Sequence, residues 1–262
     1  MMPKESMNLL RQIGVVVAVI ATIVVNVLSN VLPFNGVTVG ELAARFDVLF
    51  VPADYAFSIW MLIYVGLAAY AIYQAQPSLR HDRRLRSLDL PFMLSSIANM
   101  SWLLLWHYQH YMATFVVMLV LVGSLITIYR RLDIERPSVT PARRWAVHHP
   151  FSAYLGWVTI AAMANLGVVL DYLGWTGSSL GETTWFTLGV LTVLGIAGVM
   201  SWLRSDVVFL LALMWGLIGI GIERAADPMI STLVWTATAV LGVMVALSAV
   251  QRSPDEPDGY LP

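Results

Sequence analysis

The sequence contains no cysteine and few charged residues, and each shortage excludes a class of protein. Without thiols the chain has no disulfide, thiolate metal site, iron–sulfur cluster, covalently attached c-type haem or cysteine nucleophile. Only 12% of the residues are charged and the formal net charge is -1. Nucleic-acid binding needs a concentrated basic surface, so we expect no nucleic-acid partner.

Catalytic motifs are also missing. The sequence has no serine nucleophile elbow, zinc-binding HExxH motif, phosphate-binding loop or carboxylate pair. The acidic residues closest to the apolar segments lie near their ends, at Asp54, Asp171, Asp206 and Glu223. Proton-coupled and cation-coupled transporters generally place an ionisable group near the membrane midplane. These patterns favour a protein that is not an enzyme, has no metal site and does not couple transport to ions.

What the sequence has in abundance is apolar residues, at 58% of the chain with a mean hydropathy of +0.74. This composition is typical of a multi-span membrane protein. We predict an all-α integral membrane protein with about eight transmembrane helices, since each apolar segment approaches the ~20 residues that a spanning helix needs. The segments are 13–34, 54–76, 91–107, 112–129, 148–170, 184–203, 207–223 and 229–250. The segments 91–107, 112–129 and 207–223 are short for this purpose, which predicts local thinning or a buried position.

The basic residues predict how the chain crosses the membrane. With a cytoplasmic N-terminus, only Arg45 and Arg224 of the 15 lysines and arginines fall on the outer side. This bias is the positive-inside pattern and requires an even number of spans. We therefore expect both termini in the cytoplasm, most simply at a prokaryotic plasma (inner) membrane. The proline-rich, acidic tail 251–262 is expected to be disordered.

The outer loop 35–53 carries a helix-start signal. Thr38 and Glu41 have the spacing of a capping box, and LAARF follows them. The pattern predicts a short helix at the membrane surface. Two interpretations stay open: the helix covers a ligand site as a lid, or it rests on lipid headgroups.

Ten tryptophans are present, and six of them lie inside predicted spans. These six are Trp60, Trp102, Trp106, Trp157, Trp215 and Trp235. An indole N–H in hydrocarbon needs a partner or a polar cavity. The predicted orientation places Trp60, Trp102 and Trp106 at similar depth in the outer half of the membrane. They either pack helix against helix or form an aromatic pocket.

Polar and small residues in and beside the spans add three further expectations. The amides Asn26, Asn30, Asn99 and Asn165 either hydrogen-bond between helices or contact a ligand. Glycines in 184–203 and 207–223 predict that these two segments pack closely on each other. His107 and His110 share a helical face, which suits an axial iron ligand or an ordinary solvated pair.

Three segments together resemble the TspO/MBR family, the tryptophan-rich sensory proteins that include the mitochondrial translocator protein (peripheral benzodiazepine receptor). The first is a proline-led helix with a Trp-x-x-x-Tyr core, from Pro52 through Trp60 and Tyr64. In the second, an asparagine is followed by tryptophans, as in Asn99, Trp102 and Trp106. The third matches Tyr154, Leu155, Trp157, Ala161 and Asn165, with Ala164 where the family has leucine.

The resemblance covers residues 10–175 and implies the family's five-helix bundle with a ligand pocket under the first external loop. It divides the chain into a cytoplasmic N-terminus (1–12), a TspO-like bundle (13–175), three additional transmembrane helices (176–250) and the tail (251–262). The implied ligand is a planar hydrophobic molecule, a tetrapyrrole such as porphyrin or haem, with no obligatory cofactor. The implied ligand-binding residues are Trp60, Tyr64, Asn99, Trp102, Trp106, Tyr154, Trp157, Ala161 and Asn165.

The expected function is therefore a membrane receptor, sensor or carrier, and the expected partners are lipid, the hydrophobic ligand and a second copy in a homodimer. Three alternatives stay open. The chain is a small-solute transporter completed by its last three spans, a membrane enzyme that modifies a tetrapyrrole or lipid, or a structural scaffold that binds no small molecule.

Overall fold

The computed structural model describes residues 4–32, 34–46, 48–135, 139–175 and 181–251, which form helices and no strands. Most of the expected tail therefore lies outside the described residues, as do residues 1–3 of the N-terminus. The long helices, in chain order, are Lys4–Val31 (α1), Ile59–Gln74 (α3), Asp89–His107 (α5), Tyr111–Leu132 (α6), His149–Tyr172 (α8), Glu182–Arg204 (α9), Val207–Glu223 (α10) and Pro228–Gln251 (α11). Each of the eight predicted segments corresponds to one of them.

Six helical stretches are long and apolar enough to cross a membrane, and α10 is a shorter apolar helix of 17 residues. The chain is thus an all-α integral membrane protein. One expected length was wrong: the segment 112–129 is not a short span, because α6 runs on to Leu132 and has 22 residues. Its last turn carries Arg130 and Arg131, which lie beyond the predicted end of the segment.

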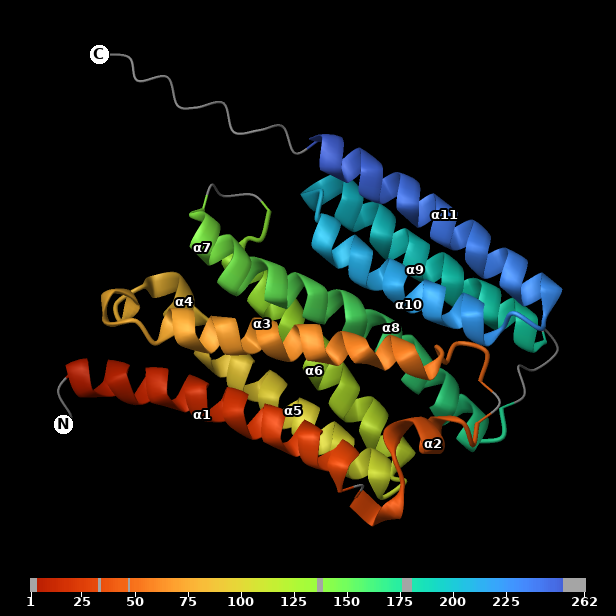
Figure 1. Cartoon of the computed structure of the whole chain (residues 1–262), viewed down its shortest axis with the longest axis horizontal. Helices are drawn as coiled ribbons and strands as arrows, with labels where there is room; N and C mark the ends of the chain where they lie inside the picture. The colour runs from red at the N-terminus through yellow and green to blue at the C-terminus, as the bar shows by residue number, and fades with distance from the viewer. Residues whose placement is uncertain (1–3, 33, 47, 136–138, 176–180, 252–262) are drawn as a thin grey trace.

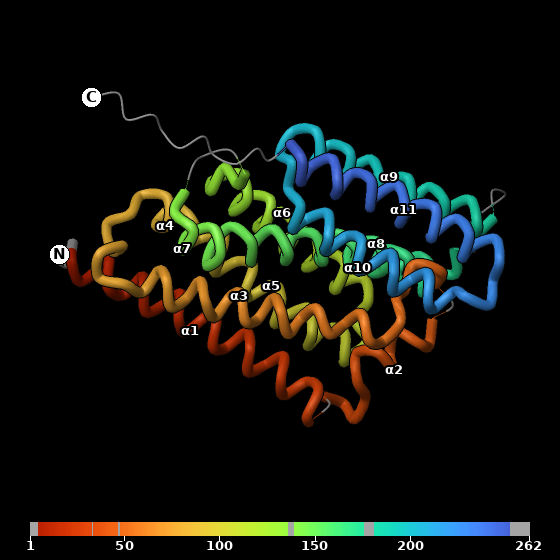
Figure 2. Tube along the Cα trace, turned by 45° about the horizontal axis from the view of Figure 1, so that its top comes forward, coloured from red at the N-terminus to blue at the C-terminus, as the bar shows by residue number. Residues whose placement is uncertain are grey.

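The first five long helices close into a ring. Following the contacts around it, α1 packs on α3, α3 on α8, α8 on α6, α6 on α5 and α5 on α1. The other three helices gather beside α8, on the side away from α1 (Figure 2). The start of α1 and the end of α11 lie toward the same end of the molecule, near the short helices Arg83–Ser87 (α4) and Pro141–Arg143 (α7), whereas Val39–Ala43 (α2) lies at the opposite end (Figure 1).

Close packing joins the two groups of helices between α8 and α10. A Cβ atom at Gly156 of α8 would lie 2.7 Å from the Phe209 carbonyl oxygen of α10. A Cβ atom at Gly216 of α10 would lie 2.7 Å from the Ile160 side chain of α8. Small residues let helix backbones approach in this way within membranes. The expectation that the glycines of 207–223 serve packing on 184–203 was wrong, because Gly156 and Gly216 bring α10 against α8 instead.

Candidate functional site

The predicted capping box forms and positions α2 over the ring of five helices. The Glu41 amide donates to Thr38 Oγ1 at 3.2 Å, and the Thr38 amide donates to Glu41 Oε2 at 2.7 Å. Hydrogen bonds from the Thr38 backbone and side chain hold the pKa of Glu41 below its usual value. Leu42 and Ala43 on the other face of α2 are buried. The helix therefore lies against protein and not only against lipid headgroups.

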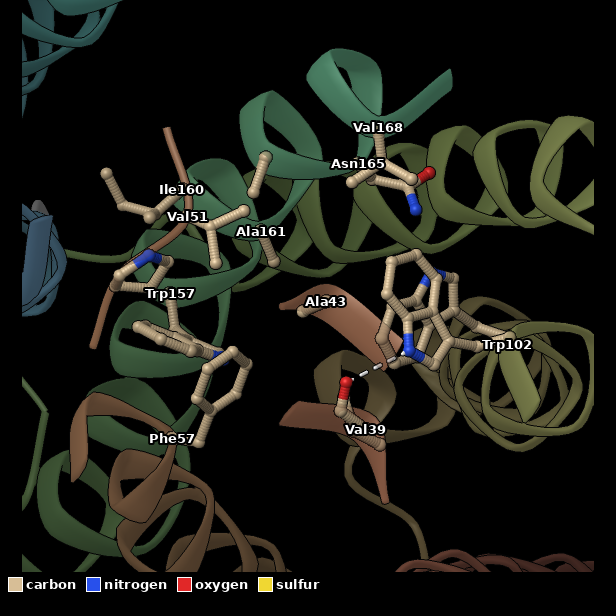
Figure 3. A pocket seen from close by; sticks show the side chains of 13 residues that line it. Val39, Ala43, Val51, Phe57, Trp102, Trp157, Ile160, Ala161, Asn165 and Val168 are labelled. Carbon is tan, nitrogen blue, oxygen red and sulfur yellow. Dashed lines mark hydrogen bonds between the residues drawn. The ribbon is translucent and has the colours of Figure 1, made fainter. Parts of the chain in front are cut away.

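Beneath α2 lies a cavity of about 50 Å³. It is bordered by α2, α5, α8 and the residues that lead into α3, and Figure 3 shows Trp102 facing Trp157 and Phe57 across it. Its lining residues are Val39, Ala43, Val51, Pro52, Phe57, Trp102, Trp106, Trp157, Ile160, Ala161, Ala164, Asn165 and Val168. Apart from one amide and three indole N–H groups, the lining side chains are apolar.

Aromatic rings form two opposite walls of the cavity. Trp102 and Trp106 stack on each other with ring centroids 5.2 Å apart and an interplanar angle of 19°. Trp157 meets Phe57 edge to face at 5.9 Å. Trp106 also holds α2, because its Nε1 donates to the Val39 carbonyl oxygen at 3.3 Å.

Three buried polar atoms of the lining residues have no hydrogen-bond partner. They are two donors, the Nε1 atoms of Trp102 and Trp157, and one acceptor, Oδ1 of Asn165. The amide nitrogen of Asn165 is engaged, since it donates to Thr114 Oγ1 at 3.2 Å. Buried polar groups are nearly always paired in native proteins. The cavity thus offers two hydrogen-bond donors and one acceptor that no described residue pairs.

The remaining predicted site residues lie outside this lining. Asn99 accepts a hydrogen bond from Asn26 Nδ2 at 2.9 Å through its Oδ1 and donates to the Tyr154 hydroxyl at 3.0 Å, linking α1, α5 and α8. Trp60 stacks on Tyr64 at 5.5 Å and meets Trp157 edge to face at 6.4 Å. Of these four residues, Trp60 contacts the cavity wall at Trp157. The cavity itself is bordered directly by Trp102, Trp106, Trp157, Ala161 and Asn165.

We expect the Asn99 network to stabilise the bundle and not to contact ligand. Asn99→Ala removes the hydrogen bonds to Asn26 and Tyr154, although Asn26 Nδ2 still donates to the Thr22 carbonyl oxygen. It should lower the free energy of unfolding in micelles by about 1–3 kcal/mol. Tyr154→Phe removes a single hydrogen bond, typically about 0.6 kcal/mol within a membrane, and should leave ligand affinity unchanged. Loss of ligand binding in Tyr154→Phe with stability intact would contradict this division of roles.

Sequence patterns missed eight of the lining residues. The capping box itself gives a signal for Val39 and Ala43, because it marks the start of α2 and residues four apart share a helix face. Ala164 was noted only as a departure from the family's leucine, and its small side chain now borders the cavity. His107 was weighed as an iron ligand, but it is fully buried beneath Phe34 and does not line the cavity.

A comparison with models of known protein families shows which family the chain belongs to. A family model described as TSPO-like protein matches residues 12–247. The chain belongs to the TSPO-like protein family. No curated protein and no solved structure gave a match.

The TSPO-like match has two consequences. It runs through the last three helices, beyond residue 175, where the resemblance seen in the motifs ended. It also makes the chain a membrane protein of a sensing or ligand-binding family. The cavity beneath α2 contains residues from all three of the motifs that carried the resemblance, Pro52, Trp102 and Trp157 among them.

Proposed function

We propose that this TSPO-like protein is a non-enzymatic membrane sensor or carrier that binds a tetrapyrrole in the cavity beneath α2. The observation that carries the proposal is the pairing of aromatic walls with unpaired polar atoms at Trp102, Trp157 and Asn165. Aromatic rings suit a flat π system through stacking and burial of area. In this proposal α2 faces the exterior, and both termini lie on the cytoplasmic side of a prokaryotic inner membrane.

A metal-free porphyrin complements the three unpaired polar atoms of the cavity better than haem does. Its carboxylate side chains can accept hydrogen bonds from the two indole N–H groups, and its central N–H groups can donate to Asn165 Oδ1. Haem has no central N–H, and its iron usually takes an axial histidine, cysteine, methionine or tyrosine. None of these four residue types is among the described residues that line the cavity.

Binding requires the cavity to open. Sites for drug-sized ligands measure about 300–1,000 Å³, and this cavity measures about 50 Å³. We propose that α2 moves outward when the ligand enters. Among the described residues, the hydrogen bond that would break joins Trp106 Nε1 to the Val39 carbonyl oxygen, and the burial of Leu42 and Ala43 would be lost with it.

Titration of the protein in nanodiscs with protoporphyrin IX tests the proposal. We expect saturable quenching of tryptophan fluorescence in the wild type and about 10- to 100-fold weaker binding in Trp157→Phe, because one hydrogen bond to a charged group contributes about 1.5–3 kcal/mol. Trp202→Phe is the matched control, since it also removes one tryptophan but from a side chain that is 83% exposed on α9. Quenching that never saturates, or that is equal in both variants, would overturn the proposal.

A further inference from the structure

Among the described residues that line the cavity, none comes from α9, α10 or α11. Hydrogen bonds nevertheless join α10 to one of the cavity walls. That wall is residues 48–58, which we call the wall segment; it runs from the loop through the 3₁₀ turn Asp54–Ser58 (η2) into α3. Its Val51, Pro52 and Phe57 side chains line the cavity. The position of this segment therefore determines the shape of the site.

Three hydrogen bonds join the wall segment to α10 and its C-terminal end. Trp215 Nε1 donates to the Ala56 carbonyl oxygen at 2.8 Å. The Ala53 amide donates to the Gly219 carbonyl oxygen at 3.1 Å, and Arg224 Nη2 donates to the Val48 carbonyl oxygen at 2.6 Å. Among the described residues, every hydrogen bond from this segment to a different helix goes to this one partner. Peptide groups in irregular backbone need such partners when they are buried.

Packing reinforces the same junction. A Cβ atom at Gly219 would lie 2.8 Å from the Ala56 Cβ and 2.9 Å from the Pro52 Cβ, so the two backbones are in close contact. Tyr55 meets the Trp215 ring edge to face at 5.5 Å. α9 adds a second support, because Phe50 packs on Phe186 with ring centroids 5.6 Å apart.

We propose that α10 holds the wall segment in place and thereby sets how long the ligand stays bound, with Trp215 as the principal positioning residue. This inference rests on the proposed function for the part that concerns ligand. Hydrogen bonds hold the wall segment near its start, in its middle and near its end. Their partners in and beside α10 are Arg224, Gly219 and Trp215, in that order. Among the described residues, α2 is joined to α5 by one hydrogen bond, from Trp106 Nε1 to the Val39 carbonyl oxygen, and it packs on Asp54 of the wall segment through Gly40. In this proposal α10, supported by α9, fixes one side of the site, and α2 is the part that moves when the cavity opens.

Amide hydrogen exchange and ligand dissociation, measured on the full chain in nanodiscs, test this role. Trp215→Phe keeps a ring against Tyr55 but removes the donor to Ala56. We expect exchange of the amides at 51 and 53–57 to rise about fivefold, the effect of losing a typical single hydrogen bond. Protoporphyrin IX should dissociate about fivefold faster while its association rate stays nearly constant. Exchange in α5 and α6 should not change.

Two further variants complete the test: one removes a second hydrogen bond to the wall segment, and the other is a control for the loss of a tryptophan. Arg224→Met removes the bond at Val48 without altering a buried ring and should raise exchange at the start of the segment. Trp202→Phe, on the exposed face of α9, should match the wild type in both measurements. Wild-type exchange in Trp215→Phe and in Arg224→Met would overturn the positioning role. Faster exchange in these variants, with no saturable porphyrin binding by the wild type, would support that role and overturn the proposed ligand.

Discussion

Ala161→Trp should abolish porphyrin binding, with a loss of affinity of at least about 100-fold, equivalent to about 2.8 kcal/mol. Ala161 borders the cavity on α8, between Trp157 and Asn165. An indole at this position fills a space that measures only about 50 Å³ in the closed structure. The ligand would then have to displace a large side chain in addition to α2. Equilibrium titration in nanodiscs measures the effect.

The matched control for this change is Ala239→Trp, the same substitution at an exposed position on α11. It should bind porphyrin like the wild type, because an added indole there faces outward. Unchanged affinity in a correctly folded Ala161→Trp protein would show that the ligand sits elsewhere. Circular dichroism and size-exclusion chromatography establish the folding of both variants.

Gly156→Leu should lower the free energy of unfolding by about 3 kcal/mol, at the upper end of the usual cost of overpacking. The new Cβ would meet the Phe209 carbonyl oxygen at 2.7 Å and the Ala212 Cβ at 2.8 Å, so a backbone must move. Separation of α8 from α10 should also loosen the wall segment and weaken ligand binding. Unfolding in mixed micelles reports the stability.

Gly123→Leu provides the comparison for this prediction. Gly123 lies on α6, and a Cβ atom added there meets nothing within 4 Å. The substitution replaces a poor helix former with a good one and should be neutral or stabilising. Equal destabilisation by the two substitutions would contradict the close packing of α8 on α10.

Local patterns predicted much of this architecture because they depend on nearby residues. Apolar length and charge positions located all eight long helices, and the Thr38–Glu41 spacing located α2. The end of α6 at Leu132 was missed because a spanning helix can carry Arg130 and Arg131 at its membrane boundary, where their long side chains reach water.

The site itself was predicted only in part, since its decisive features depend on which helices meet. Asn99 and Asn165 are both buried amides, and nothing in the local sequence says that Asn99 finds two partners while Asn165 Oδ1 finds none. The glycines of α10 likewise predicted close packing, but on the wrong neighbour, since order along the chain favoured 184–203. Gly216 meets α8 and Gly219 meets the wall segment, contacts that join residues far apart in the chain.

The central claim is that a tetrapyrrole lies between Trp102 and Trp157 beneath α2. The most direct test is a structure of the protein determined by electron microscopy or crystallography with protoporphyrin IX bound. We predict ring density between the two indoles, polar contacts to Trp102 Nε1, Trp157 Nε1 and Asn165 Oδ1, and α2 displaced outward while the wall segment stays against α10. Porphyrin bound only at a lipid-facing surface, with the cavity closed as it is here, would contradict the account.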